Sequence, residues 1–160
     1  MALPDEIATE RLRLPLWTGD DVTAIRGGGR RPGWHPQFPR EDDVDAASMW
    51  REGDPWSSRS ITVEDLAVGS VGFFGPPETA ADGVPEAEIG YGLVEDARGR
   101  GFATEAVSAL VAAAEAEGAR VRASVLPDNQ PSIRVLAKCG FTELRGSNED
   151  GELVMVRPLR

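Results

Sequence analysis

Two hydrophobic periods divide the chain. Polar and apolar residues alternate around Leu12, Leu14 and Leu16, which predicts an opening strand over residues 9–17. The same alternation, bounded by turn residues, predicts six further strands, over residues 57–65, 67–75, 86–94, 120–126, 141–145 and 152–159. These seven segments make a β-sheet the expected centre of the fold.

Helical spacing is clearest after residue 100. Apolar residues recur every three or four positions between residues 103 and 114, and Gly118 is well placed to end that helix. A shorter helix is predicted over residues 129–140, with Asn129 as its cap and Gly140 at its end. These two helices separate the last four predicted strands.

Two further helices are expected between the first and second strands. One runs through residues 21–25 and ends at a triple glycine, and the other covers residues 41–54. The predicted order is therefore β-α-α-β-β-β-α-β-α-β-β, which belongs to the α+β class. We find no internal repeat, low-complexity tract or interdomain linker, so a single domain over residues 1–160 is expected.

The composition is that of a soluble globular protein. Of the 160 residues 41% are hydrophobic and 28% are charged, and no run approaches the roughly 20 apolar residues of a membrane span. The first residues lack the basic region and apolar core of a signal peptide, so we expect a cytoplasmic protein with no membrane partner. The single cysteine, Cys139, is expected in the core, and with one histidine it leaves too few ligands for a metal site.

Charge narrows the range of partners. The formal net charge of -10 argues against nucleic acid, which needs a broad basic surface, and suits a cationic substrate. The exception is Arg98-Gly99-Arg100-Gly101, just before the helix that follows residue 101. Glycines there permit close approach to free backbone N–H groups, and the arginines add charged donors, so the run is a candidate anion site. A glycine turn with solvated arginines is the alternative.

This run resembles a known motif. "ARGRGFATEA" (residues 97–106) is similar to the pyrophosphate-binding motif of the GNAT superfamily of acetyl-CoA-dependent N-acetyltransferases, with Arg98, Gly101 and Ala103 at its defining positions. "NQPSIRVLAKCGF" (residues 129–141) resembles a second segment of the family, at the expected interval. The strand before the first motif and the opening strand resemble the branch that includes the ribosomal-protein alanine acetyltransferases. The resemblance covers nearly the whole chain.

The resemblance implies a fold and a donor site. The fold would be a mixed, mostly antiparallel sheet of six to seven strands with about four helices and a splay between strands four and five. The splay would leave backbone groups of Leu93 and Val94 free for the pantetheine arm and the thioester carbonyl of acetyl-CoA. Asn129 and Ser132 would lie beside the pantetheine and the sulfur. The pyrophosphate would be held by the N–H groups of Arg98, Gly99, Arg100, Gly101, Phe102, Ala103 and Thr104.

Acetyl transfer to an amine needs a base, an oxyanion donor and stabilisation of the leaving thiolate. The backbone N–H of Val94 is the expected oxyanion donor. Many GNAT enzymes protonate the thiolate with a tyrosine, but the corresponding residue here is Leu136. Ser132 is therefore the expected acid, with helix capping as its alternative role. Glu88 is the expected base, with an exposed structural glutamate as the alternative.

Family architecture places the two N-terminal helices and the loop between them over the acceptor. Four residues are expected to bind the acceptor: Trp34, His35, Phe38 and Tyr91. A surface histidine and a small aromatic core are the alternatives for the loop residues. The acidic run from Glu41 to Asp54 would attract a polycationic acceptor if it borders the pocket, and is otherwise a solvated helix face.

We therefore expect an acetyl-CoA-dependent N-acetyltransferase that uses no metal. Its acceptor would be a primary amine, carried by a small cationic molecule of the aminoglycoside or polyamine type or by a protein N-terminus. One alternative is a GNAT-fold module that binds acyl-CoA without turnover, and another is a transferase that uses a different acyl-CoA, such as succinyl-CoA. Dimers are common in this branch, so a homodimer is the expected alternative to a monomer.

Overall fold

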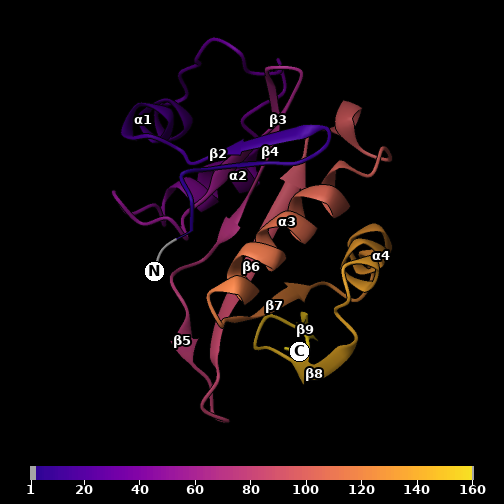
Figure 1. The fold of residues 1–160 in the computed structure, drawn as a ribbon. Helices are drawn as coiled ribbons and strands as arrows, with labels where there is room; N and C mark the ends of the chain where they lie inside the picture. The colour runs from indigo at the N-terminus through magenta and orange to yellow at the C-terminus, as the bar shows by residue number, and fades with distance from the viewer. Residues whose placement is uncertain (1–2, 160) are drawn as a thin grey trace.

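An open sheet runs through the computed structural model, which describes residues 3–159 (Figure 1). The described residues form β1 (Glu6–Ala8), β2 (Leu12–Pro15), β3 (Arg59–Val63), β4 (Leu66–Phe73), β5 (Glu78–Thr79), β6 (Pro85–Leu93), β7 (Arg120–Val125), β8 (Glu143–Ser147) and β9 (Leu153–Arg157). The strand order is β1-β2-β3-β4-β6-β7-β9-β8, with β5 paired to β6. Every described pair is antiparallel except β6 with β7. The predicted mixed, mostly antiparallel sheet is confirmed.

The structure contains two strands, β1 and β5, in addition to the seven that were predicted. β1 contains three residues and β5 contains two. An alternating pattern needs about four residues to stand out from its surroundings, so neither strand has a sequence signal of its own. Both are placed by their partners, β1 by a hairpin with β2 and β5 by the start of β6.

The described part of the chain contains four α-helices and one 3-10 helix. They are α1 (Gly19–Gly27), α2 (Glu41–Ala47), η1 (Glu95–Ala97), α3 (Phe102–Ala116) and α4 (Gln130–Lys138). The prediction for α2 was too long, because the Ser48 hydroxyl donates to the Asp45 carbonyl and Gly53 adopts a φ of 76°. No helix within residues 3–159 is long and apolar enough to cross a membrane.

Helix α3 covers one face of the sheet, crossing in front of β6 in Figure 1. Its predicted apolar face is confirmed, since Ala106, Val107, Leu110, Val111 and Ala114 are all buried. The small alanines let the helix axis approach the strands closely, and each fully buried larger side chain contributes about 1.5–3 kcal/mol. The N-terminus of α3 is thereby fixed against the sheet, beside the ends of β6 and the splay.

Strands β6 and β7 separate after three paired positions. Their parallel pairing joins residues 86–88 to residues 120–122. Beyond this point β6 stays paired with β4 as far as Leu93, while β7 stays paired with β9 as far as Val125. A gap therefore opens between the two strands, and the predicted splay is confirmed.

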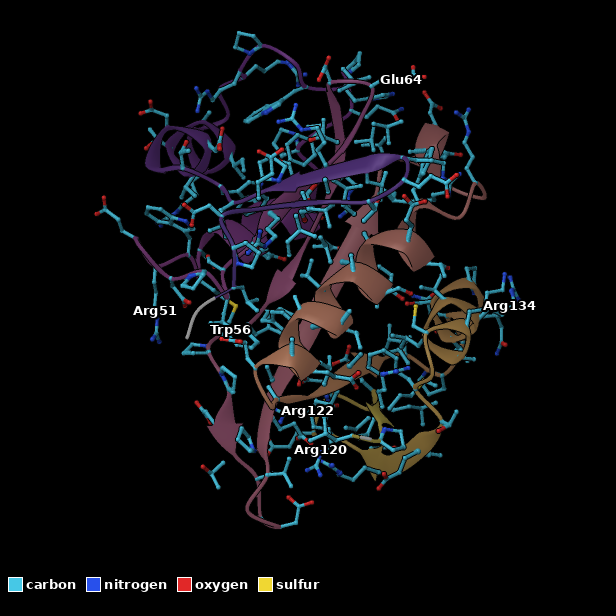
Figure 2. All side chains as sticks on the ribbon, viewed as in Figure 1. Arg51, Trp56, Glu64, Arg120, Arg122 and Arg134 are labelled. Carbon is cyan, nitrogen blue, oxygen red and sulfur yellow. The ribbon has the colours of Figure 1, made fainter. Side chains whose placement is uncertain are left out.

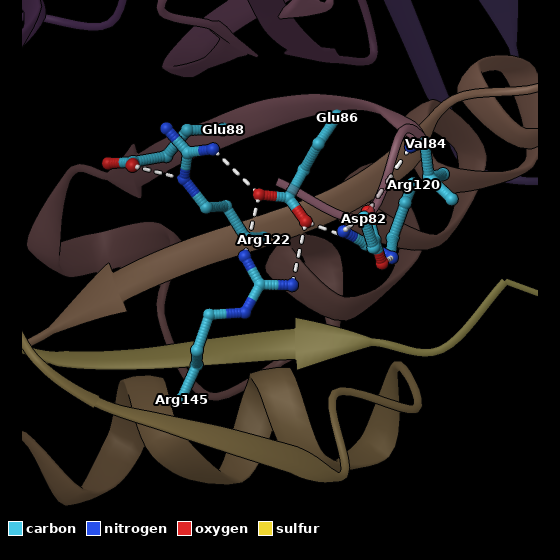
Figure 3. A network of polar contacts seen from close by, with 7 residues as sticks. All are labelled: Asp82, Val84, Glu86, Glu88, Arg120, Arg122 and Arg145. Atoms are coloured by element: carbon cyan, nitrogen blue, oxygen red, sulfur yellow. Dashed lines mark hydrogen bonds and ion pairs between the residues drawn. The ribbon is translucent and has the colours of Figure 1, made fainter. Parts of the chain in front are cut away.

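A buried carboxylate closes the paired end of these strands (Figure 3). The Glu86 side chain is 1% exposed and accepts hydrogen bonds from Arg120 Nε at 2.6 Å, Arg122 Nη1 at 2.7 Å and both Nη atoms of Arg145 at 2.8 and 2.9 Å. Burial raises the pKa of Glu86, but the three guanidinium groups outweigh this effect and lower it to about 2. Figure 2 shows Arg120 and Arg122 together at this end of the molecule.

This network should make the free energy of unfolding depend on pH in the acidic range. The pKa of Glu86 is below its ordinary value of 4.5, so its contribution is complete above that pH and is lost as the pH falls towards 2. We expect Glu86→Gln to lower the free energy of unfolding at neutral pH by about 3 kcal/mol, because it removes a buried charge that pairs with three arginines, of which Arg120 is itself buried. The variant should also lose less unfolding free energy than wild type as the pH is lowered.

Chemical denaturation of both proteins across this pH range measures the effect. Glu143→Gln, which removes an exposed carboxylate on β8, is the matched control and should leave the pH dependence unchanged. An equally steep acid-induced fall in wild type and Glu86→Gln would contradict the assignment.

Candidate active site

Helix α3 begins at a glycine that no side chain within residues 3–159 caps. Gly101 is the N-cap, with a φ of 82°, and Gly99 has a φ of 77°. This left-handed region strongly favours glycine, because any other side chain is strained there. The first N–H groups of the helix, from Phe102 to Thr104, are consequently left for a ligand, and the helix dipole favours an anion at that end.

Two arginines, Arg98 within this loop and Arg11 from outside it, fix its position. Arg98 donates from Nε to the Leu93 carbonyl at 3.1 Å. Arg11 donates from Nη1 to the Arg100 carbonyl at 2.8 Å, and its Nε pairs with Glu105 Oε1 at 2.7 Å. Sequence reasoning missed Arg11, because its partners lie 89 and 94 positions further along the chain and no local pattern indicates such a contact.

A cavity of about 550 Å³, the first cavity, adjoins this loop. Among its lining residues are nine of the eleven expected to bind the donor: Leu93, Arg98, Gly99, Gly101, Phe102, Ala103, Thr104, Asn129 and Ser132. Arg134 and Lys138 of α4 also line it, and Figure 2 shows Arg134 extending from α4 away from the sheet. Four cationic side chains, those of Arg40, Arg98, Arg134 and Lys138, line the first cavity, and together with an uncapped helix N-terminus they suit a phosphate-bearing ligand.

Val94 and Arg100 do not line the first cavity. The Val94 N–H donates to the Val68 carbonyl at 2.8 Å, so the expectation that it is a free oxyanion donor is wrong. Backbone groups alternate in direction along a strand, and the register of β6 on β4 turns those of Tyr91 and Leu93 towards the gap. The sequence analysis therefore chose Leu93 correctly as a residue whose backbone faces the gap, but the Val94 N–H faces β4.

A pair of hydroxyl groups links β6 to α4 at the gap. Tyr91 Oη lies 2.6 Å from Ser132 Oγ, and Asn129, the N-cap of α4, accepts from the Ser132 N–H at 3.2 Å. Burial raises the pKa of Tyr91, an effect that the hydrogen bond with Ser132 opposes, so the phenol is protonated at neutral pH. Leu136, at the position of the family's usual tyrosine, is buried. The tyrosine beside Ser132 therefore comes from β6, whereas the family's usual tyrosine would come from α4.

A second cavity, of about 370 Å³, lies over β4, β6 and β7 beside α2. Glu88 lines it, with its Oε1 accepting from Arg122 Nε at 3.0 Å, and Glu152 lines it as well. Five residues line both cavities: Arg40, Asp42, Tyr91, Asn129 and Ser132. Within the described chain no group of three or more His, Cys, Asp or Glu side chains could hold a metal ion. The two cavities thus meet at the hydroxyl pair.

A buried carboxylate holds Arg40 at this junction. Asp43 is fully buried and accepts from Arg40 Nη2 at 3.0 Å, from Arg40 Nε at 3.2 Å and from the Ser70 hydroxyl at 2.5 Å. A Cβ added at Gly92 would lie 2.2 Å from Arg40 Nη2, so the guanidinium crosses β6 where the strand has no side chain. Sequence reasoning missed this pair, because an acidic run is usually a solvated helix face.

Gly92→Ala should therefore destabilise the fold by about 2 kcal/mol, because it displaces the Arg40 guanidinium from the buried Asp43 carboxylate. Urea denaturation measures the change. Gly27→Ala is the matched control, since a Cβ at that position meets nothing within 4 Å. Equal unfolding free energies for Gly92→Ala and Gly27→Ala would show that the Arg40 position is not fixed by Asp43.

Trp34, His35 and Phe38, expected at the acceptor, line neither cavity. Phe38 is fully buried, and its ring meets the Trp34 ring edge-on, with 5.1 Å between their centres. His35 Nε2 lies 3.4 Å from Asp96 Oδ2. The loop is folded onto itself because Arg30 donates to four of its backbone carbonyls. Trp34 and Phe38 thus pack against each other, as in the small aromatic core that was the alternative interpretation.

Solved structures share this architecture over nearly the whole chain. An acetyltransferase from Agrobacterium tumefaciens str. C58 is 23% identical, with a TM-score of 0.67 over 98% of this chain and 95% of that one. Mycobacterium smegmatis RimJ in complex with CoA-disulfide is 23% identical, with a TM-score of 0.65 over 98% and 88% of the two chains. A ribosomal-protein-S5-alanine acetyltransferase from Vibrio fischeri is 18% identical, with a TM-score of 0.62 over 96% and 94%. At these identities the likeness concerns the fold.

Sequence comparison assigns the family. No curated protein matches the chain. The family model described as acetyltransferase (GNAT) domain matches residues 11–142, which is most of the chain. This match includes the loop at Gly101, the splayed strand β6 and helix α4. The chain therefore belongs to the GNAT acetyltransferase family.

Proposed function

We propose that this protein is an acetyl-CoA-dependent N-acetyltransferase, with its donor in the first cavity and its amine acceptor in the second. The observation that carries the proposal is the junction at Tyr91, Asn129 and Ser132, which line both cavities. Ligands in the two cavities would meet at this junction, which Arg40 and Asp42 also border. Family membership supports the same chemistry, and the similar RimJ structure was solved with a CoA-disulfide.

The lining of the first cavity fits a CoA thioester. The pyrophosphate would accept hydrogen bonds from the N–H groups between Gly101 and Thr104, with Arg98 and the two basic residues of α4 adding positive charge. The pantetheine arm carries amides that can pair with the backbone groups of Tyr91 and Leu93 along the gap. These two N–H groups replace Val94 as the donors nearest the thioester carbonyl.

The reaction joins the amine nitrogen to the thioester carbonyl carbon and breaks the carbon–sulfur bond. The carbonyl oxygen gains negative charge as the nitrogen attacks, and backbone N–H groups of β6 stabilise it. CoA leaves as a thiolate, which takes a proton from the Tyr91–Ser132 hydroxyl pair. The proton lost by the amine passes to Glu88 through water, since Glu88 lines the second cavity.

The acceptor is a primary amine of a small cationic molecule or of a protein N-terminus. Three carboxylates line the second cavity, those of Asp42, Glu88 and Glu152, and they favour an ammonium group. The likeness to a ribosomal-protein acetyltransferase supports the protein N-terminus. We also propose a cytoplasmic location, which suits the free thiol of Cys139.

The test is release of free thiol from acetyl-CoA with spermidine, an aminoglycoside and short peptides as acceptors, beside calorimetry of acetyl-CoA binding. Binding together with thiol release on at least one amine supports the proposal. Binding without turnover on any amine would favour the acyl-CoA-binding module, and no binding would overturn both. Faster transfer from succinyl-CoA than from acetyl-CoA would keep the mechanism and change the donor.

A further inference from the structure

We infer that the acceptor carries its primary amine beside an apolar group. This inference rests on the proposed acetyltransferase function and names the substrate class of its second cavity. The evidence is the lining of that cavity, which combines carboxylates with exposed apolar side chains. The same chemistry occurs in aralkyl amines and in peptides that begin with a hydrophobic residue.

Large apolar side chains gather at the second cavity. Met49, Phe74 and Leu126 are 49%, 47% and 49% exposed, and all three line it. They are half of the six large hydrophobic side chains exposed within residues 3–159. They come from three separate parts of the chain, residue 49 after α2, residue 74 after β4 and residue 126 after β7. Because three separate segments each supply an exposed apolar side chain to one cavity, we interpret these side chains as an apolar contact surface.

Phe74 has a defined place in this surface. A Cβ added at Gly90 would lie 2.7 Å from Phe74 Cζ, so the ring lies against the bare backbone of β6. The next glycine on that face of the strand, Gly92, accommodates Arg40 in the same way. Gly90, covered by the Phe74 ring, therefore lines the second cavity, whereas Gly92, covered by the Arg40 guanidinium, lines the first.

The apolar surface limits the number of polar groups that the acceptor can carry. Asp42, Glu88 and Glu152 attract its ammonium group. A polyamine or an aminoglycoside would set further charged or hydroxyl groups against Met49, Phe74 and Leu126, where they lose hydration without gaining partners. A monoamine with an apolar substituent avoids this cost.

Matched acceptors test the inference by thiol release. We expect kcat/KM for 2-phenylethylamine to exceed that for ethanolamine and spermidine at least tenfold, and Leu-Ala-Ala to exceed Ser-Ala-Ala similarly. The first comparison addresses small amines and the second addresses N-termini. Equal or higher values for the polar members would overturn the inference while leaving the acetyltransferase proposal intact.

Phe74→Ala links the preference to the cavity. It should lower kcat/KM for the preferred apolar acceptor about tenfold and leave the KM for acetyl-CoA unchanged. Leu144→Ala is the matched control, since Leu144 is 61% exposed on β8 and does not line the cavity. Equal effects of the two variants would overturn the inference. Unchanged kinetics would also overturn it, if Phe74→Ala also converted a dimeric wild type to a monomer in sedimentation. The apolar surface would then be a dimer interface and not an acceptor site. A protein that fails to bind acetyl-CoA in calorimetry would overturn the proposed function itself.

Discussion

Gly101→Val is expected to raise the KM for acetyl-CoA at least 100-fold or to abolish binding. The valine side chain would stand at the N-cap of α3, among the N–H groups that we assign to the pyrophosphate. It would also disfavour the left-handed backbone, with a φ of 82°, on which the direction of those N–H groups depends. A 100-fold loss of affinity corresponds to about 2.7 kcal/mol, which is the scale of several backbone hydrogen bonds to an anion.

Backbone strain alone needs to be separated from this loss. Gly118 has nearly the same φ, 81°, at the opposite end of α3, and a Cβ there meets nothing within 4 Å. Gly118→Val therefore imposes comparable strain on the same helix without touching the first cavity. Both variants should lower the melting temperature by similar amounts, and only Gly101→Val should lose acetyl-CoA in calorimetry. An unchanged donor KM in Gly101→Val would refute the assignment of the pyrophosphate site.

Local patterns predicted the elements that form the proposed donor site. The N-cap Asn129, the helix end at Gly118 and the apolar face of α3 follow from residues close together in sequence, where capping and periodicity act. The resemblance of residues 97–106 then assigned the proposed pyrophosphate site to one of these elements. These features are local, so the sequence contains all the information that they need.

Features that depend on register or on distant partners could not be predicted in this way. Whether Val94 or Leu93 turns its N–H towards the gap depends on the pairing of β6 with β4, and a shift of one residue would reverse the answer. Arg11 reaches the α3 loop from the other end of the sequence. The burial of Asp43 depends on Arg40 and on Ser70 of β4, whereas its neighbours alone suggest an exposed acidic helix.

The loop before α2 shows the same limit in a different form. Its tryptophan, histidine and phenylalanine were typical of a binding pocket and equally typical of a small core. Arg30 favours the small core by drawing the loop carbonyls around its guanidinium. A single arginine with several carbonyl partners has no pattern that marks it in the sequence. The acceptor site that we propose consequently rests on the cavity lining and not on a sequence pattern.

Tyr91→Phe is expected to lower kcat roughly 10- to 100-fold while leaving the KM for acetyl-CoA nearly unchanged. The variant keeps the ring and removes the hydroxyl that lies 2.6 Å from Ser132 Oγ. General acids contribute about 10²- to 10⁴-fold, and a thiol with a pKa near 8.5 needs the help less than most leaving groups, so the effect should lie at or below the lower limit of that range. Because burial raises the pKa of Tyr91 above its ordinary value of 10, the phenol should remain a donor throughout neutral pH.

The double variant distinguishes a hydroxyl pair from two independent contacts. If Tyr91 and Ser132 deliver one proton as a unit, Tyr91→Phe with Ser132→Ala should be no slower than the slower single variant, because removing either hydroxyl already interrupts the delivery. Two independent contacts would instead multiply their effects on kcat. The pH profile adds a second criterion, since wild-type kcat should lose activity through this group only above pH 10, and Tyr91→Phe should lack that loss. A Tyr91→Phe enzyme with wild-type kcat and an unaltered profile would leave Ser132 as the sole candidate acid and reduce the tyrosine to a packing role at the gap.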